Sequence, residues 1–386
     1  MAENDFRKKI LIIYVAAGSG HTTYSRAIQS GLEKLFPGKY IIKEMDYIKE
    51  IGPASFDRSS KNIWTFMLKH PYVGRFSDSF VEKFQPLAQA IEFAWSQKHI
   101  KNSVRFINDY KPDIIIAPHP QTLRVAVITR KKLGLKTPVI GIDIEPFSGG
   151  AVYDYPGADK IVVFSEQAKT GLMKKGVPEH KLPVFDFIID SKFLKNYDSI
   201  ENTRKKIGLE PGILTIMMSS GGDGIGNLEK YIKTTIAHNL PVQLAVMTGR
   251  NAKLKEKLEK IELPRDSRTV LKILGFIENF SDFIYASDVV LGKGGACTTV
   301  ESLFMRKPVI YYRFVTGNEK RNIDFARKNQ FGWYTRTTRG YLKIIRGILK
   351  NPETLDHIKK KYERLNFKAG TEKFCRFIAD VLNTGE

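Results

Sequence analysis

Residues 290–322 read VLGKGGACTTVESLFMRKPVIYYRFVTGNEKRN, a stretch that joins two apolar runs through a turn and a helical pattern. The run at residues 289–291 predicts a short buried strand, and the run at residues 309–312 predicts the next strand. Two basic residues and a proline at 306–308 mark the end of the helix between them. A strand, helix and strand in this order are typical of a parallel, doubly wound α/β sheet.

The turn before this helix is predicted to bind an anion. Gly292, Gly294 and Gly295 let the backbone approach a ligand, since glycine has no Cβ. Residues 297–299 lie in the first helical turn, where free N–H groups and the positive end of the helix dipole favour phosphate. Lys293 adds a full positive charge beside them.

Further polar side chains follow on the same edge of the predicted sheet. Glu301 lies one turn into the helix and has the chemistry to hydrogen-bond sugar hydroxyls. After the second strand, Gly317, Asn318, Glu319 and Asn322 form a polar loop. We expect this loop at the strand-end edge that also carries the glycine turn. A plain doubly wound unit with a glycine turn is the alternative to a ligand site.

These motifs resemble the nucleotide-sugar half of family 28 glycosyltransferases of the diacylglycerol glycosyltransferase and MurG kind, a group that includes monogalactosyldiacylglycerol synthases. The family pattern runs roughly K-P-G-G-x-T-x-x-E-A, then P-V-I, then P-G-Q-E-x-x-N, and this chain has KGGACTTVES, PVI and TGNEKRN. The matching positions are Lys293, Gly295, Thr298, Glu301, Gly317, Glu319 and Asn322. The departures are Gly294, Ala296, Thr316 and Asn318.

The resemblance implies a role for the residues that would bind the donor. Lys293 and the helix N-terminus at Thr298 would stabilise the departing UDP, and Glu301 would hold the ribose hydroxyls. Asn318 and Glu319 would hold the transferred sugar. Asn318 stands where the family has a Gln, and its shorter side chain leaves the identity of the sugar open.

Other segments of the second half resemble the same family. The loop SSGGDGIG at 219–226 is similar to G-G-G-x-G, and TGRN at 248–251 is similar to C-G-R-N. The resemblance implies that the glycine loop admits the diphosphate and that Phe276 and Ile277, in the segment beginning ILGF, border the uracil. The remaining expected donor-binding residues are Gly221, Gly222, Arg250, Gly295 and Asn322.

The first half has its own motif, AAGSGHTTYSRAI at 16–28, which resembles the family's G-G-G-H-x-x-A-A-x-A-I. Gly18, Gly20 and His21 match, and Ser19 replaces a glycine. A lone His is more often structural, but the resemblance implies that His21 is catalytic and lies beside the acceptor hydroxyl. An imidazole with a pKa of about 6.5 can accept a hydroxyl proton at neutral pH.

The acceptor side is less completely matched. The stretch DIIIAPHPQTLRVAVI resembles the family's P-D-x-I-x-S-x-H-P, and its His119 favours the galactolipid-synthase branch, although a buried structural His fits as well. Asp143 matches an acidic residue of the family, but the His and Trp that usually follow are absent. The family's G-I-P-V pivot is DFII at 186–189. The expected acceptor-binding residues are Gly20, Trp64, His119 and Asp143.

The fold class that the resemblance implies is α/β GT-B, with two Rossmann-like doubly wound domains facing across a cleft. Apolar runs predict strands at 10–15, 40–45, 114–117, 139–142 and 160–164 in the first half, and at 213–218, 243–248 and 271–274 in the second. We expect an acceptor-binding domain at 1–190 and a UDP-sugar-binding domain at 205–370. The polar segment 184–204 is interpreted as the linker, and the amphipathic C-terminal helix within 371–386 is expected to pack back on the first domain.

The net charge of +21 has three possible sources: an anionic membrane surface, compositional bias, or nucleic acid. Residues 301–350 hold 12 bases and 3 acids, so the excess is concentrated. No nucleic-acid-binding motif is found, and nucleic acid is not expected as a partner. Residues 56–106 interleave aromatic and basic side chains in helical patterns, which fits a membrane interface or core packing equally well.

The chain is expected to be cytoplasmic and peripherally associated with the cell membrane. Its first residues, MAENDFRKK, mix acids with bases and do not form a signal peptide, and no apolar run approaches the ~20 residues of a membrane span. Cys297 and Cys375 lie far apart in sequence, which suits a reducing compartment. No metal and no cofactor are expected, and a UDP-sugar would be the co-substrate.

The sequence thus predicts an inverting glycosyltransferase that moves galactose or glucose from a UDP-sugar to diacylglycerol or a related membrane lipid. The alternatives are a MurG-type N-acetylglucosaminyltransferase with a lipid-linked acceptor, a UDP-sugar 2-epimerase, and a non-catalytic binder of lipid or nucleic acid.

Overall fold

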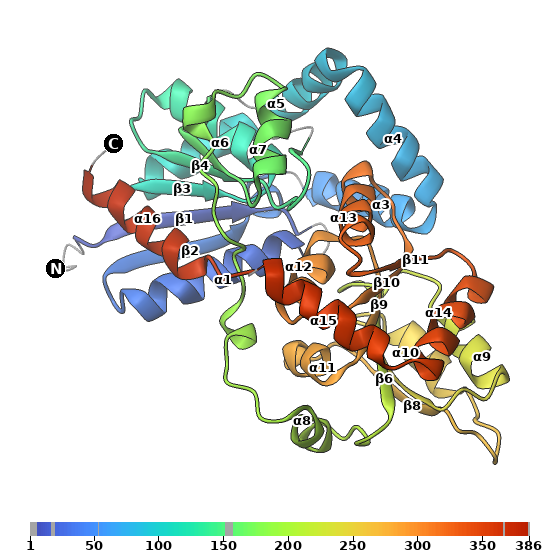
Figure 1. Cartoon of the computed structure of the whole chain (residues 1–386). Coiled ribbons are helices and arrows are strands. Elements are labelled where there is room, and N and C mark those ends of the chain that lie inside the picture. The colour runs from blue at the N-terminus through green and yellow to red at the C-terminus, as the bar shows by residue number, and fades with distance from the viewer. Residues whose placement is uncertain (1–5, 17–19, 53, 151–156, 366, 385–386) are drawn as a thin grey trace. The chain divides into compact units, whose positions relative to one another are not determined.

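The computed structural model describes residues 6–16, 20–52, 54–150, 157–365 and 367–384 (Figure 1). The chain divides into two compact units. Unit 1 contains Met1–Phe66, Arg75–Ser191 and Ala369–Glu386, and unit 2 contains Met67–Gly74 and Lys192–Lys368. Each unit is built on one parallel sheet.

The sheet of unit 1 has the strand order β2-β1-β3-β4-β5. The strands are β1 (Lys8–Tyr14), β2 (Tyr40–Asp46), β3 (Ile114–Ala117), β4 (Val139–Ile142) and β5 (Lys160–Val162). All neighbouring pairs are parallel. The chain passes from one side of β1 to the other between β2 and β3, so the topological switch point lies between β1 and β3.

The helices of unit 1 are α1 (Gly20–Leu35), α2 (Tyr47–Ile51), α5 (Gln85–Tyr110), α6 (Pro120–Leu133), α7 (Glu166–Met173) and α16 (Thr371–Thr384), with a short 3-10 helix at Glu179–Lys181. Two more helices, α3 (Ala54–Lys69) and α4 (Pro71–Lys83), belong to unit 1 except for Met67–Gly74, which belongs to unit 2. The sixteenth helix returns to the first: a Cβ on Gly31 would lie only 2.8 Å from the Cys375 sulfur, so glycine permits this close packing. Burial raises the pKa of the Cys375 thiol to about 12.

The sheet of unit 2 has the order β11-β10-β9-β6-β7-β8. The strands are β6 (Leu214–Ser219), β7 (Val242–Met247), β8 (Val270–Leu274), β9 (Val289–Lys293), β10 (Val309–Arg313) and β11 (Gly332–Tyr334). Every pair is parallel. Numbered within the unit, this is the dinucleotide-binding order 3-2-1-4-5-6, whose switch point lies between β6 and β9.

The helices of unit 2 alternate with its strands. They are α8 (Ile200–Lys206), α9 (Glu229–Ala237), α10 (Ala252–Glu259), α11 (Phe280–Ala286), α12 (Ala296–Phe304), α13 (Gly317–Lys328), α14 (Thr338–Lys350) and α15 (Glu353–Leu365), with a 3-10 helix at Ser191–Phe193. The strands contribute fully buried residues such as Ile216, Leu244 and Leu291 to the core, as their continuous apolar runs predict.

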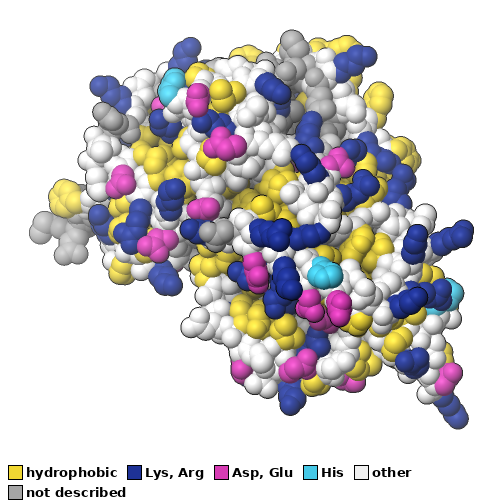
Figure 2. Space-filling model, in the orientation of Figure 1, with side chains coloured by type: hydrophobic (Ala, Val, Ile, Leu, Met, Phe, Trp, Pro, Cys, Tyr) yellow, Lys and Arg dark blue, Asp and Glu magenta, His cyan; other side chains and the backbone are white. Residues whose placement is uncertain are grey.

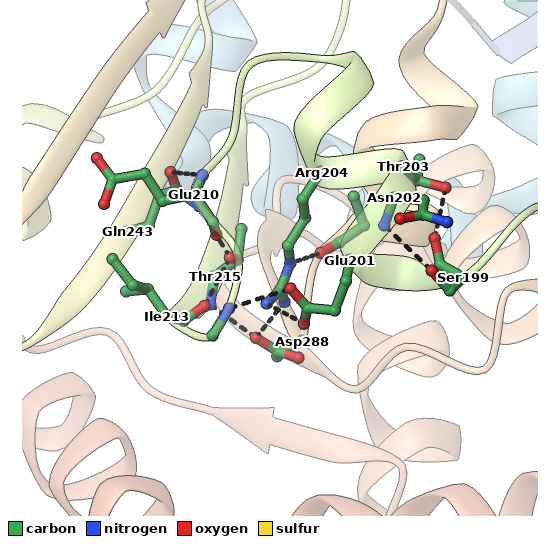
Figure 3. A network of polar contacts seen from close by, with 12 residues as sticks. Ser199, Glu201, Asn202, Thr203, Arg204, Glu210, Ile213, Thr215, Gln243 and Asp288 are labelled. Carbon is green, nitrogen blue, oxygen red and sulfur yellow. Dashed lines mark hydrogen bonds and ion pairs between the residues drawn. The ribbon is translucent and has the colours of Figure 1, made fainter.

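The segment predicted as a linker, 184–204, is well packed at both ends. Ile189 exchanges hydrogen bonds with the Thr371 hydroxyl, its N–H donating at 2.8 Å and its carbonyl accepting at 2.7 Å. At the other end, Arg204 is 3% exposed and its guanidinium donates to Asp288 at 2.8 Å and to the Ala286 carbonyl at 2.9 Å (Figure 3). The polarity of this end of the segment therefore reflects an ion-pair network centred on the buried Arg204, whose partners Asp288 and Glu201 are partly exposed.

The predicted fold class, two doubly wound parallel sheets, is confirmed, with two local corrections. Gly292 and Lys293 belong to the end of β9, so the turn is shorter than predicted. Residues 317–322 form the start of α13 and not a loop, because Thr316 caps the helix by accepting a hydrogen bond from the Glu319 N–H at 3.2 Å. In the part of the chain that the structure describes, the helices are too short or too polar to cross a membrane.

Candidate functional site

The residues predicted to bind the donor gather at one edge of the unit 2 sheet. Each follows the carboxyl end of a strand, which is where open α/β sheets bind ligands. The strands and their residues are β6 with Gly221 and Gly222, β7 with Arg250, β8 with Phe276 and Ile277, β9 with Gly295, Thr298 and Glu301, and β10 with Asn318, Glu319 and Asn322. Lys293 is the last residue of β9.

Lys293 lies at the switch point itself. Its strand, β9, neighbours β6, and a Cβ on Gly221 would lie 3.3 Å from Lys293 Cε and 3.6 Å from its Nζ. The left-handed φ of +82° at Gly221 requires glycine there. The Lys293 ammonium is 4.0 Å from Glu319 Oε1, and its side chain is 17% exposed. A positive charge therefore borders the glycine loop, with its side chain mostly buried and Glu319 nearby.

Tyr312 of β10 contacts the glycine loop after β6 and supports it. The Tyr312 hydroxyl and Ser220 Oγ are hydrogen-bonded at 2.8 Å, and a Cβ on Gly226 would lie 2.2 Å from the Tyr312 oxygen. The Gly222 carbonyl accepts a hydrogen bond from the Arg250 N–H at 2.8 Å. These contacts fix the loop whose backbone is expected to approach the diphosphate, and the motifs did not indicate Ser220 or Tyr312.

The N-terminus of α12 follows directly after Lys293. Gly295 is its cap residue and has no side chain, so the cap position supplies no hydrogen bond to the N–H groups of the first turn. Gly294 is needed for a close approach, since a Cβ there would lie 2.5 Å from the Glu319 carbonyl oxygen. The buried Asn322 amide donates to the Gly294 carbonyl at 2.9 Å and clamps α13 onto the turn.

Glu319 has a structural role besides its predicted one. Its Oε2 accepts a hydrogen bond from the Val315 N–H at 2.6 Å, while its Oε1 faces Lys293. Asn318 Oδ1 accepts from Arg321 at 3.0 Å. Glu319 is thus held in one orientation next to the switch point. A residue that positions a sugar hydroxyl has to be fixed in this way.

Three further predicted donor residues, Glu301, Arg250 and Phe276, lie at the edges of this group. Glu301 is 9% exposed in the second turn of α12. The Arg250 guanidinium stacks on Phe276, 4.8 Å from the ring centroid, and Phe276 is 54% exposed. The pair presents an aromatic and cationic surface on which a flat base can stack.

In unit 1, His21 and His119 meet at the β1/β3 switch point. His21 lies in the first turn of α1, after β1, and His119 caps α6, after β3. Their ring centroids are 4.5 Å apart in an edge-to-face arrangement. The sequence placed them in separate motifs, and the structure brings them together.

The hydrogen bonds of the two rings determine where their protons lie. His21 Nδ1 is 2.7 Å from the Pro118 carbonyl, which can only accept, so neutral His21 carries its proton on Nδ1 and leaves Nε2 as an acceptor. His119 Nδ1 accepts from the Gln121 N–H at 3.2 Å, so its proton is on Nε2. Burial lowers the pKa of His21 to about 4. Burial and the electrostatic effect of the neighbouring His21 lower the pKa of His119 well below its usual value.

The other predicted acceptor residues lie in different settings. Asp143 is fully buried, and its carboxylate accepts from the Glu145 N–H at 3.0 Å and the Gly150 N–H at 2.8 Å, so it holds the loop after β4. Burial raises its pKa to about 7. The Trp64 indole N–H is buried and has no hydrogen-bond partner among the described residues. Gly20 begins α1, and Gly18 lies outside the described residues.

Residues 226–329 match the family described as Glycosyltransferase family 28 C-terminal domain. The match includes Lys293 and the N-termini of α12 and α13. This part of the chain is therefore similar to the C-terminal domain of this family. The predicted resemblance is confirmed, and the predicted enzyme class, a glycosyltransferase, agrees with the family.

Two relatives extend the similarity beyond this domain. The chain is 24% identical over 353 residues to a probable monogalactosyldiacylglycerol synthase of Nicotiana tabacum, which covers 89% of this chain and 65% of the relative. It is 22% identical over 384 residues to the processive diacylglycerol beta-glucosyltransferase of Bacillus subtilis, which covers 98% and 96%. The chain thus spans about two thirds of the plant relative and nearly all of the bacterial one.

Solved structures share the fold. The chain matches MurG of Acinetobacter baumannii with a TM-score of 0.59 at 13% identity, over 97% of this chain and 99% of that one. It matches UDP-GlcNAc 2-epimerase of Neisseria meningitidis with a TM-score of 0.58 at 13% identity, over 97% and 100%. These matches confirm the GT-B-like fold, which a transferase and an epimerase have in common.

Proposed function

We propose that this chain is an inverting glycosyltransferase that transfers a hexose, galactose or glucose, from a UDP-sugar to diacylglycerol or a related membrane lipid. Residues 1–190 would bind the acceptor and residues 205–370 the donor. The observation that carries the proposal is the position of Lys293: a lysine at the switch point of a dinucleotide-type sheet, between a glycine loop and an uncapped helix N-terminus, in a family 28 domain.

On the donor side, charge develops on the diphosphate as the bond to the sugar breaks. The Lys293 ammonium and the first-turn N–H groups of α12 stabilise that charge without rearrangement, because Gly221 and Gly294 already hold the loop and the helix in place. Glu301 is assigned to the ribose hydroxyls. Glu319 is assigned to the transferred sugar, where its fixed carboxylate accepts from a hydroxyl.

On the acceptor side, a lipid hydroxyl donates its proton to a base as it attacks the anomeric carbon. His21 Nε2 is the acceptor that this step needs, and the lowered pKa keeps it unprotonated at neutral pH. His119 presents the opposite group, an N–H donor, so the pair can orient one hydroxyl by accepting from it and donating to it.

Helices α3–α5 supply a surface that suits a lipid acceptor. Large apolar side chains that would normally be buried are exposed there: Ile63, Phe66, Tyr72, Phe76, Phe84, Leu87, Ile91 and Phe93. Exposed Lys69 and Lys83 accompany them, and Figure 2 shows that Lys and Arg side chains are widespread over the visible face. We propose that this surface rests on an anionic membrane and that the protein acts in the cytoplasm as a peripheral membrane protein.

The alternatives predict different products. A 2-epimerase converts a UDP-sugar without an acceptor, and a MurG-type enzyme requires a lipid-linked sugar acceptor. Incubation with each UDP-sugar alone, and then with diacylglycerol, separates the three by two readouts, the isomerisation of the UDP-sugar and the release of UDP. We expect UDP only when diacylglycerol is present. An isomerised UDP-sugar in the first incubation would identify an epimerase. If no UDP is released in the presence of diacylglycerol, diacylglycerol is excluded as the acceptor.

A further inference from the structure

A second cavity of unit 2 lies at the outer edge of its sheet. β11 is the last strand in the sheet order, and with α13, α14 and α15 it lines a cavity of about 680 Å³ that opens to solvent at the exposed Arg327, Gln330 and His357. Two strands, β9 and β10, stand between β11 and the switch point at β6. The volume is in the usual range for a small-molecule ligand, about 300 to 1,000 Å³.

Three basic side chains line this cavity without an acidic one. They are Arg327, His357 and Lys361. The Lys361 ammonium donates to the neutral Gln330 side chain, and the Arg327 and His357 side chains make neither an ion pair nor a hydrogen bond with any described residue. Arg327 and Lys361 are cationic at neutral pH, so the side chains that line the cavity carry a net positive charge.

The rest of the lining suits a ligand body with both apolar and hydroxyl groups. The half-buried Trp333 ring and the side chains of Ile344 and Ile358 form an apolar wall. Thr354 provides a hydroxyl, whereas the Thr335 hydroxyl donates to the Thr337 carbonyl at 3.2 Å. Basic side chains are exposed in the region where Figure 1 shows α14 and α15, as Figure 2 shows.

We propose that this cavity binds a small phosphorylated metabolite, a phosphomonoester on a body of about the size of a sugar. Such a phosphate carries about −1.5 to −2 charges at pH 7, which matches two permanent cations, whereas a single carboxylate leaves one unbalanced. The Arg327 guanidinium and the Lys361 ammonium bind the phosphate oxygens, and the body lies against Trp333. The site shares none of its lining residues with the donor site, so it is independent of the proposed function.

Trp333 is a built-in reporter for this site. The chain has three tryptophans, and Trp64→Phe with Trp95→Phe leaves Trp333 as the only one. We would titrate this protein with glucose 6-phosphate while UDP saturates the donor site, and follow tryptophan emission. We expect a saturable change at lower concentration than for inorganic phosphate or for glucose. Calorimetry on the unsubstituted chain gives the same comparison if the double substitution impairs folding.

Matched variants decide whether the signal comes from the cavity. Arg327→Gln with Lys361→Gln should weaken the binding of glucose 6-phosphate about ten- to a hundredfold. Lys343→Gln with Lys350→Gln removes two exposed lysines of α14 that do not line the cavity, and should leave binding unchanged. Equal affinity in the two double variants, no saturable binding, or equal affinity for inorganic phosphate alone would each overturn the proposal.

Discussion

The imidazole rings of His21 and His119 contact each other edge to face, at 4.5 Å between centroids and an interplanar angle of 66°. Their backbone contacts impose opposite tautomers, so His21 presents an acceptor at Nε2 and His119 a donor. Both follow the strands that flank the β1/β3 switch point, which is a common ligand position in sheets of this order. The pair is the basis of the acceptor chemistry proposed for unit 1.

Loss of the His21 base should affect turnover and not donor binding. We expect His21→Ala to lower kcat by about 10² to 10⁴-fold, because the base acts only as the acceptor hydroxyl attacks. Affinity for UDP, measured by calorimetry, should stay within about twofold, since the donor residues belong to unit 2. A comparable loss of UDP affinity would assign His21 a structural or donor-binding role.

The two lowered pKa values predict a pH dependence of stability. An unfolded His titrates near pH 6.5, whereas the pKa of folded His21 is about 4, so between these values the unfolded chain binds the proton and the folded chain does not. The stability is therefore complete above pH 6.5 and falls as pH decreases toward 4; His119, also lowered, adds in the same direction. Asp143, whose pKa burial raises to about 7, acts in the opposite direction over this range, so the histidine contribution is the part of the Tm change between pH 7 and pH 5 that is lost when the two imidazoles are removed.

The control for this pH effect is a variant without the two imidazoles. His21→Gln with His119→Gln should show a shallower decrease of Tm over the same pH range, because carboxylates elsewhere, Asp143 included, contribute equally to both proteins. Identical slopes for the two proteins would show that the histidines do not titrate as their burial implies.

Adjacent glycines in the turn after β9 should differ sharply in their tolerance of alanine. A Cβ on Gly294 would lie 2.5 Å from the Glu319 carbonyl, whereas a Cβ on Gly295 would meet nothing closer than 3.7 Å. Gly294→Ala should lower the free energy of unfolding by about 1 to 3 kcal/mol through overpacking against α13. Gly295→Ala should change it by less than about 0.5 kcal/mol. Urea denaturation measures both, and equal effects would contradict the close approach of α13 to the turn.

Membrane attachment should depend on charges of α3 and α4. Lys61 is ion-paired with Asp46 at 3.6 Å, so the exposed Lys69 and Lys83 are better candidates for contact with headgroups. Lys69→Glu with Lys83→Glu should release the protein from anionic vesicles in sedimentation, and salt should weaken wild-type binding because the Debye length is only about 8 to 10 Å.

The matched control for attachment reverses two charges on another helix. Lys343→Glu with Lys350→Glu alters the net charge of the chain equally, but on α14, and should leave vesicle binding nearly intact. Equal release by both pairs would attribute binding to the overall charge and not to the surface of α3–α5.

Local sequence patterns predicted the strands and the positions of donor residues well. The strands at 114–117 and 139–142 have the predicted bounds, because continuous apolar runs flanked by proline leave few alternatives. Residues 317–322, the start of α13, were predicted as a loop, although Thr316 and Glu319 have the spacing of a capping box. That signal was present in the sequence and outweighed by the glycine and asparagine around it.

Long-range relationships were beyond the reach of these patterns. The support of the glycine loop by Tyr312 joins residues 92 positions apart, and the contact of His21 with His119 depends on β1 and β3 being neighbours. Asp143 was predicted to bind the acceptor from its resemblance, but its burial under the loop at 145–150 depends on how that loop folds back. Strand order and loop closure are tertiary properties that a local motif does not encode.

The most direct test of the central claim is the transfer of labelled sugar to a lipid. The full chain would be incubated with vesicles of diacylglycerol and an anionic phospholipid, and with UDP-glucose or UDP-galactose labelled in the sugar. We predict label in the organic phase, in a product with inverted anomeric configuration, from wild type and not from His21→Ala or Lys293→Ala. Label that stays entirely in the aqueous phase with every UDP-sugar, while the protein binds UDP, would contradict the account.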